Sequence, residues 1–261
     1  MIYLTGDCHG DFHRFARRQR EKLSVEPGEG DQVIVCGDLG LLWARDGELT
    51  YNLKWLSKLP FTLLWVQGNH ENYDLIAEYP MEQWNGGKVR HILRDKIILL
   101  ERGQIFRIEG KRFFTFGGAS SHDIQGGILD RNSPTYAKDR KKANQKGLSY
   151  RVRNVSWWEQ ELPSEAEMQE GRENLSRAGY AVDYVITHCL SGRMQEALDR
   201  YFGIPVGNRS YDRDILTDYF EELEKQIRYR CWFCGHYHIN LELDEKHVIL
   251  YKDIVCLDDF R

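Results

Sequence analysis

Five apolar runs along the chain each end at a short polar segment. The runs cover residues 2–4, 33–36, 63–66, 184–186 and 231–234. Short continuous apolar runs of this kind predict strands that are buried on both faces, as in a parallel sheet. The carboxyl ends of parallel strands meet at one edge of a sheet, so we expect the polar segments that follow these strands to gather there.

The rest of the chain predicts helices around these strands and a second group of strands. Amphipathic or capped stretches predict helices over residues 12–23, 49–59, 71–79, 164–178 and 211–228. Short apolar stretches predict strands over residues 97–100, 104–108, 112–116, 241–243, 248–251 and 254–257. Helices that alternate with strands, followed by a group of antiparallel strands, indicate an α/β fold with two packed sheets and helices outside them.

The polar segments contain the side chains that a metal site would need. They are Gly6-Asp7-Cys8-His9-Gly10, Gly37-Asp38, Gly68-Asn69-His70-Glu71, Thr187-His188 and Gly235-His236-Tyr237-His238. Carboxylate and amide oxygens combined with imidazole nitrogens suit Mn, Fe or Zn. The neighbouring glycines allow the backbone to turn sharply and to approach an ion or a phosphate group closely.

The order of these segments resembles that of the calcineurin-like metallophosphoesterases. The family pattern runs Asp-x-His, Gly-Asp, Gly-Asn-His-Asp/Glu, a lone His and then Gly-His-x-His. This chain has every ligand-bearing element in that order, from Asp7 to His238. A single element of the pattern occurs by chance, but the ordered set, with each member after an apolar run, is specific.

The resemblance implies a four-layer α/β/β/α sandwich, with two mixed β-sheets flanked by helices, and a centre of two divalent or trivalent metal ions. It implies that one ion is held by Asp7, His9 and His238, the other by Asn69, His188 and His236, and that Asp38 bridges them. In this family a metal-bridging hydroxide attacks phosphorus in line. The residue that corresponds to His70 binds no metal and acts as a proton donor to the leaving group or stabilises the transition state.

The chain also departs from one branch of this family. In the protein Ser/Thr phosphatases the Gly-Asp element continues as x-x-Asp-Arg-Gly, where the Asp orients the catalytic His and the Arg binds phosphate. Here those three positions are Leu41, Leu42 and Trp43, and the lone His188 is followed by Cys189-Leu190 instead of Gly-Gly. A dedicated phosphoprotein phosphatase is therefore disfavoured, and the candidates for the acid that orients His70 are Asp46, Asp74 and Asp123.

The segment over about 120–163 fits neither group of strands and reads as an insertion. It concentrates positive charge on a chain whose formal net charge is −4, through Lys138, Arg140, Lys141, Lys142, Lys146, Arg151 and Arg153. Two interpretations stay open. The segment is either a solvated surface loop or a lid that brings cations over a phosphorylated substrate. Arg131, Arg151 and Arg153 are the candidate substrate-binding residues.

Composition narrows the class of protein further. A chain of 261 residues with 41% hydrophobic residues can bury one large core, so residues 1–261 are predicted to form a single domain. The chain begins in a predicted strand, with no charged segment and apolar stretch before it, and no apolar run is long enough to span a bilayer. We therefore expect a cytoplasmic protein with no membrane partner. The net negative charge argues against binding to an extended nucleic-acid duplex.

The sequence predicts a phosphoesterase, and several alternatives remain beside it. The metal centre serves monoesters and diesters equally, so the substrate is a phosphorylated small molecule, a nucleotide or a phosphoprotein. Alternatives within the class are a Ser/Thr-type protein phosphatase and a nucleotide or nucleic-acid phosphodiesterase. The alternative outside the class is a catalytically silent metal-binding interaction module. The presence of His70 together with the full ligand set favours the enzyme. The sequence leaves the oligomeric state open.

Overall fold

The first sheet carries the N-terminal apolar runs. A computed structural model describes residues 1–23, 26–205 and 207–260. In this sheet the strand order is β15-β1-β2-β3-β6-β5-β4. Its parallel centre consists of β1 (Ile2–Thr5), β2 (Gln32–Val35), β3 (Thr62–Trp65) and β6 (Ile97–Leu100). Antiparallel strands complete it at both sides, namely β15 (Val255–Cys256), β5 (Gly87–Leu93) and β4 (Met81–Trp84).

The second sheet carries the C-terminal apolar runs and is also mixed. Its strand order is β13-β14-β12-β11-β8-β7. The parallel strands are β14 (His247–Ile249), β12 (Cys231–Cys234), β11 (Tyr184–Thr187) and β8 (Lys111–Phe116). The antiparallel edges are β13 (Leu241–Glu242) and β7 (Gln104–Ile108).

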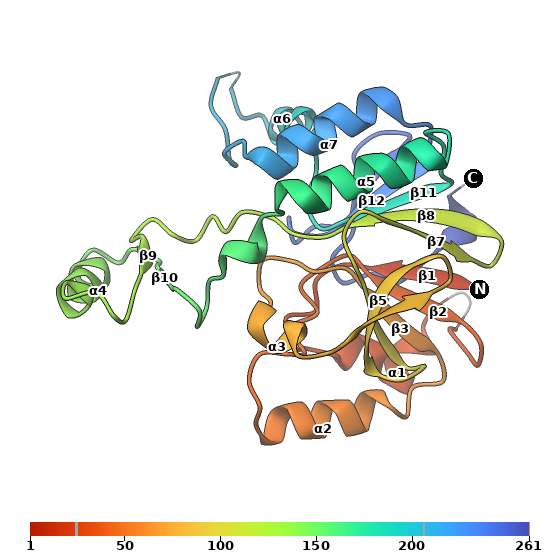
Figure 1. The fold of residues 1–261 in the computed structure, drawn as a ribbon, viewed down its shortest axis with the longest axis horizontal. Helices are drawn as coiled ribbons and strands as arrows, with labels where there is room; N and C mark the ends of the chain where they lie inside the picture. The colour runs from red at the N-terminus through yellow and green to blue at the C-terminus, as the bar shows by residue number, and fades with distance from the viewer. Residues whose placement is uncertain (24–25, 206, 261) are drawn as a thin grey trace.

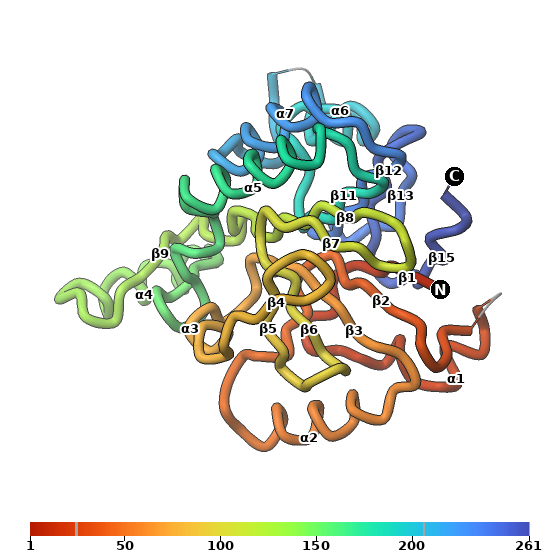
Figure 2. The backbone as a smooth tube through the Cα atoms, turned by 45° about the vertical axis from the view of Figure 1, so that its right-hand side comes forward, coloured from red at the N-terminus to blue at the C-terminus, as the bar shows by residue number. Residues whose placement is uncertain are grey.

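Helices cover the outer face of each sheet, while the two inner faces pack on one another (Figures 1 and 2). The first sheet is covered by α1 (Arg17–Arg20), α2 (Gly47–Leu56) and α3 (Tyr73–Ala77), and the second by α5 (Glu165–Arg177), α6 (Gly192–Tyr201) and α7 (Ile215–Gln226). Short 3₁₀ turns are η1 (His13–Phe15), η2 (Glu159–Glu161) and η3 (Leu257–Asp259). No helix among these is long and apolar enough to cross a membrane.

Side-chain alternation along the strands builds this layered core. In β2, Ile34 packs between the sheets, whereas Val33 and Val35 face the helices of the first sheet. In β11, Ile186 packs between the sheets and Val185 faces the helices of the second. Both strands are therefore buried on both faces, which explains why the sequence shows continuous apolar runs there. The predicted four-layer α/β/β/α fold is confirmed.

Several predicted elements differ from the structure. The helix predicted over 12–23 is broken into η1 and α1, and α7 begins only at Ile215, after its Asp214 cap. Strand β6 belongs to the first sheet, and β15 crosses back to pair with β1, so neither lies in the second group as the sequence suggested. We predicted no element at β4, β5 or α6. Strand β4 has the sequence MEQW and is exposed at alternate positions, so it lacks an apolar run.

The predicted insertion, over about 120–163, extends away from the two sheets (Figure 1). Its outer part holds β9 (Ile128–Leu129), β10 (Arg151–Val152), which pairs with β9 in parallel, and α4 (Tyr136–Gln145). Only Ala143 is buried in α4. The segment returns to the body at η2, and α5 then starts at the predicted capping box of Ser164 and Glu167.

Candidate metal centre

The candidate ligands come from five loops at the carboxyl ends of strands. Asp7 and His9 follow β1, Asp38 follows β2 and Asn69 follows β3. His188 follows β11, while His236 and His238 follow β12. The two sheets thus contribute loops to the same place, and the structure brings all seven candidate ligands together. His9 and His238, whose ring nitrogens are in contact, lie 229 residues apart in the chain.

The first candidate ion site lies between Asp7, His9 and His238. The Nε2 atom of His238 is 3.1 Å from Asp7 Oδ2, and the Nε2 atoms of His9 and His238 are 2.9 Å apart. His9 Nε2 is 3.6 Å from Asp7 Oδ2. That carboxylate oxygen is buried, and the two histidine nitrogens face it. A buried carboxylate oxygen and two imidazole nitrogens that converge in this way are donor atoms that a metal ion could bind.

The second candidate ion site lies between Asn69, His188 and His236. His188 Nε2 is 3.1 Å from Asn69 Oδ1, and the rings of His188 and His236 have centroids 5.0 Å apart. Asp38 reaches both groups, because its Oδ2 atom is 3.4 Å from His188 Nε2 and 3.8 Å from His9 Nε2. This position fits a carboxylate that is shared by two ions.

Other groups fix the direction of the ligand atoms. The carbonyl oxygen of Cys36 lies 2.8 Å from His188 Nδ1, which leaves Nε2 of that ring to face the site. The amide of Asn69 donates to Ser121 Oγ at 3.3 Å, so its Oδ1 atom also faces the site. The backbone N–H of His236 donates to Asp7 Oδ1 at 2.8 Å, and that of His70 donates to Asp38 Oδ1 at 2.7 Å.

The backbone at the site is strained. Four of the candidate ligands have φ in the left-handed region, at 49° for His9, 47° for Asp38, 71° for His236 and 52° for His238. Such conformations cost of order 1–3 kcal/mol each for residues with a Cβ, and they concentrate at functional sites. The glycines before the ligands make room for them: a Cβ on Gly68 would overlap the Asp38 carboxylate, and one on Gly235 would overlap that of Asp7.

The charges at the site favour ionised carboxylates. Burial opposes ionisation, but His188, His238 and His9 hold the pKa of Asp7 well below its usual range. Burial also opposes the ionisation of Asp38, and His188 again lowers the pKa of that group. Burial would lower the pKa of His188, but Asp38 and Asp7 raise it to about 9. Deprotonated carboxylates are the form that binds metal.

His70 lies beside the candidate ligands and contacts an arginine of the insertion. Arg151 Nη2 is 2.6 Å from Nε2 and 3.0 Å from Nδ1 of the His70 ring. Burial, which Asp38 opposes and Arg151 reinforces, lowers the pKa of His70 to about 4. Arg151 is only 3% exposed, and it also donates to Asp123 Oδ1 at 2.7 Å and to the carbonyl oxygen of Ser156 at 2.8 Å.

None of the three acids proposed to orient His70 bonds to it directly. Asp46 caps α2 by accepting from the N–H of Leu49, and Asp74 accepts from the indole N–H of Trp158 at 2.9 Å. Asp123 reaches His70 only through the guanidinium of Arg151. Sequence spacing cannot identify this arrangement, because Arg151 lies 81 residues from His70.

Of the three candidate substrate-binding arginines, the structure brings only Arg151 to the site. Arg153 is exposed and lies over the ring of Trp157, at 5.0 Å from its centroid. Arg131 is exposed between β9 and α4 and forms no hydrogen bond or ion pair with any described residue. The two arginines differ in burial and in partners: Arg151 is buried and bonds to His70, Asp123 and the backbone of Ser156, whereas Arg153 stacks on Trp157 in solvent.

Sequence reasoning missed the groups that support the site from behind. Arg14 donates to the carbonyl oxygens of Asp7 and Gly6, and thereby fixes the loop after β1. Glu71 accepts from the N–H of Leu39 at 2.9 Å, and burial raises its pKa to about 8. Glu161 accepts from Ser121 Oγ at 2.6 Å and so holds the residue that orients Asn69. Of these residues, only Glu71 belongs to a motif that the sequence shows, Gly68-Asn69-His70-Glu71.

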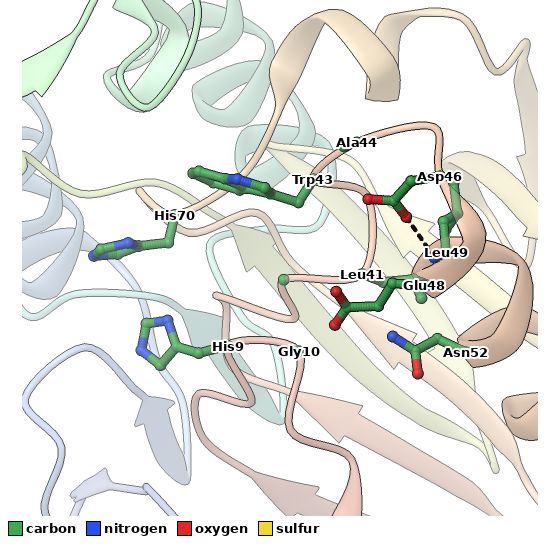
Figure 3. A pocket seen from close by; sticks show the side chains of 11 residues that line it. His9, Gly10, Leu41, Trp43, Ala44, Asp46, Glu48, Leu49, Asn52 and His70 are labelled. Atoms are coloured by element: carbon green, nitrogen blue, oxygen red, sulfur yellow. Dashed lines mark hydrogen bonds between the residues drawn. The ribbon is translucent and has the colours of Figure 1, made fainter.

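Two cavities flank the candidate ligands. The first has a volume of about 320 Å³ and is lined by His9 and His70 together with the loop and helix that follow β2 (Figure 3). The second has a volume of about 490 Å³ and is lined by His236 and His122, among others. The group of ligands is therefore open to a bound molecule on either side.

Residues 1–240 match the family model of the calcineurin-like phosphoesterases, and the chain belongs to this family. It is a metal-dependent phosphoesterase by this membership, with the donor groups that such an enzyme needs. Among solved structures it is similar to the phosphopantetheinyl hydrolase (PptH) from Mycobacterium tuberculosis. That likeness has 15% sequence identity and a TM-score of 0.40, over 96% of this chain and 87% of that one. No curated protein matches the chain.

Proposed function

We propose that the protein hydrolyses small phosphomonoesters or phosphodiesters with two metal ions held by Asp7, His9, Asp38, Asn69, His188, His236 and His238. The observation that carries this proposal is Asp7 Oδ2, a buried carboxylate oxygen on which the Nε2 atoms of two histidines converge at 3.1 and 3.6 Å. The mixed oxygen and nitrogen donors suit Mn, Fe or Zn.

When bound, two such ions would supply an activated water as the nucleophile and offset the charge on the phosphoryl oxygens. The protein residues would do the rest. Arg151 has its guanidinium group beside the site and would bind a phosphoryl oxygen. It would thereby replace the phosphate-binding arginine of the phosphatase branch, whose position is Leu42 in this chain. His70 contacts Arg151 and also lines the cavity of about 320 Å³, where it would give a proton to the leaving-group oxygen.

The size of the cavities supports small substrates. A volume of about 320 Å³ is near the lower end of the range of roughly 300–1,000 Å³ for small-molecule sites. A free phosphorylated small molecule or a nucleotide fits this range better than a folded phosphoprotein does. We rank a Ser/Thr-type protein phosphatase second, since the motif at residues 68–71 is shared with that branch while residues 41–43 are not.

Metal analysis tests this proposal. Wild-type protein reconstituted with Mn²⁺ should hold two ions per chain. Because Asp38 contacts both groups of ligands, Asp38→Asn should lower the occupancy of both sites and reduce phosphoesterase activity on the order of 10³-fold. Asp95→Asn is the matched control, since Asp95 is an exposed aspartate that also has a left-handed φ, of 61°, and it should keep both ions.

A wild-type metal content that never exceeds one ion per chain would rule out the two-metal assignment. An Asp38→Asn variant that loses one ion and keeps the other at full occupancy would place Asp38 in a single site. A panel of p-nitrophenyl phosphate, bis-p-nitrophenyl phosphate, cyclic nucleotides and phosphopeptides then decides between monoesters, diesters and phosphoproteins.

A further inference from the structure

The cavity of about 320 Å³ opens directly beside His9 and His70. His9 belongs to the candidate metal ligands, and His70 is the proposed proton donor to the leaving group. A group bound in this cavity would therefore be attached to the oxygen that leaves phosphorus. The assignment of this cavity to the leaving group rests on the proposed function, in which His70 is the proton donor.

One wall of the cavity is the indole ring of Trp43, which is 40% exposed. The ring is held in place from outside the cavity. The backbone oxygen of Trp43 accepts from the side-chain amide of Asn72 at 2.9 Å. The ring also meets Trp158 edge-on, with centroids 5.9 Å apart and an interplanar angle of 80°. A fixed aromatic ring beside an open cavity offers a flat surface on which another ring can stack.

The side of the cavity opposite His9 and His70 is formed by Glu48 and Asn52 (Figure 3). These residues are four apart on α2, so their side chains are neighbours on one face of the helix. The Glu48 carboxylate points away from α2, toward the side of the cavity where Gly10 and His9 lie (Figure 3). Neither side chain has a hydrogen-bond partner in the part of the chain that the structure describes, so both are free to bind a ligand.

The charge of the lining restricts what can bind. Glu48 and Asp46 line the cavity, and its lining contains no lysine or arginine. A leaving group that carries phosphate, sulfate or carboxylate would be repelled. A carboxylate beside an amide instead accepts from N–H groups, in the way that Glu accepts from the amino group of cytosine and Asn pairs with adenine. The lining therefore favours a flat ring that bears amino groups.

We propose that this cavity binds a nucleobase with an exocyclic amino group, stacked on Trp43 and hydrogen-bonded by Glu48 and Asn52. The substrates are then nucleotides whose nucleoside is the leaving group. Trp43 sets the preference for a flat ring, and Glu48 sets the preference for cytosine or adenine over uracil, whose carbonyl oxygen would face the carboxylate.

Binding of free nucleosides to the metal-free full chain tests this inference without turnover. The probe is the indole N–H signal of Trp43 in a ¹H–¹⁵N spectrum, assigned by its loss in Trp43→Phe. Cytidine and adenosine should shift this signal and bind about tenfold more tightly than uridine. Glu48→Gln should bring cytidine and uridine to similar affinity. Trp43→Ala should weaken the binding of cytidine and adenosine by about tenfold, observed on the nucleoside signals.

Tyr51→Ala is the matched control, because Tyr51 is an exposed aromatic residue on the same helix that does not line the cavity. It should leave all nucleoside affinities unchanged. In the metal-loaded enzyme, cytidine 5′-monophosphate should be hydrolysed with a higher kcat/KM than phosphoethanolamine, and Trp43→Ala should remove most of that difference.

Two results would overturn the inference. If nucleosides leave the Trp43 signal unchanged while the metal-loaded enzyme hydrolyses p-nitrophenyl phosphate, the cavity does not bind bases and the proposed function is unaffected. Equal kcat/KM for cytidine 5′-monophosphate and phosphoethanolamine would likewise exclude a base-specific cavity. If nucleosides bind as expected and no phosphoester is hydrolysed, the failure belongs to the proposed function.

Discussion

The edge that carries the candidate ligands and the insertion over about 120–163 hold their polar side chains in different ways. At the edge, each ligand follows a buried strand, and neighbouring loops fix it through backbone hydrogen bonds such as that from His70 N to Asp38. In the insertion, α4 buries only Ala143, and its lysines and arginine are exposed. The packing of the two sheets fixes the loops at the edge, whereas few buried contacts fix the conformation of the outer insertion.

The base of the insertion belongs to the edge rather than to its own outer part. Trp158 is 1% exposed and bonds to Asp74, while Arg102 donates to the backbone oxygens of Gln160 and Glu161. Arg151 and Glu161 are buried as well. The buried contacts of this segment and its positive charge therefore do not coincide, because most of its lysines lie in α4, which buries only Ala143.

The largest expected effect is that of His70→Ala on the edge itself. A positioned proton donor contributes typically 10²–10⁴-fold, so kcat should fall by this factor for an ester with a poor leaving group. The fall should be much smaller for p-nitrophenyl phosphate, whose leaving group needs little protonation. Metal content should stay at the wild-type value, because His70 is outside the ligand set. Equal kcat for variant and wild type on the poor leaving group would remove His70 from the reaction.

The next effect separates two arginines of the insertion. Arg151→Lys should raise the Michaelis constant and lower kcat/KM by about tenfold to a hundredfold, because a charge-assisted hydrogen bond to phosphate is worth roughly 1.5–3 kcal/mol. Dianionic monoesters should suffer more than monoanionic diesters. Arg153→Lys is the matched control two residues away, where the side chain is exposed over Trp157. Similar losses in both variants would show that the buried contact with His70 is irrelevant to binding.

A third effect concerns Glu161 and stability. Burial raises its pKa to about 8 from an ordinary value of 4.5, and this outweighs the attraction of Arg151, whose Nη1 atom is 4.0 Å away. The folded state thus favours the protonated carboxyl. Its contribution is complete below pH 4.5 and is lost as the pH rises from there to about 8, by about 1.4 kcal/mol per pH unit.

Thermal unfolding of metal-free protein measures this loss. Glu161→Gln should flatten the decline of Tm between pH 5 and 8, whereas Glu159→Gln, at an exposed neighbour, should decline as wild type does. Parallel curves for wild type and Glu161→Gln would show that Glu161 does not titrate as the buried geometry implies.

The smallest effect is expected at the outer insertion. Lys141→Ser combined with Lys142→Ser removes two exposed charges of α4 and should change stability by no more than about 0.5 kcal/mol. Hydrolysis of p-nitrophenyl phosphate should stay within about twofold of wild type. A tenfold rise in the Michaelis constant for a small substrate would instead favour the interpretation of the whole insertion as a lid.

The central strands of both sheets could be predicted from the sequence, because strands that are buried on both faces have continuous apolar runs. The elements that we missed or misplaced lack this signal. Strand β4 alternates between exposed and half-buried residues at a sheet edge, and β15 has only two residues, whose partner β1 lies at the other end of the chain. The helix predicted over 12–23 is interrupted at Ala16, whose backbone is extended, and Arg14 just before this break turns inward to bond with the loop after β1.

The sequence by itself determined the candidate ligands and the edge where they meet, since the direction of parallel strands places every loop that follows them on one side. Only the tertiary structure decided what surrounds those ligands. The contacts of Arg151 with His70, of Ser121 with Asn69 and of Trp158 with Trp43 join residues that are 52 to 115 positions apart. No local pattern encodes such pairs, because they depend on how the insertion returns to the body. The packing of the two sheets and of the insertion base therefore defines the chemistry around a ligand set that the strands alone could predict.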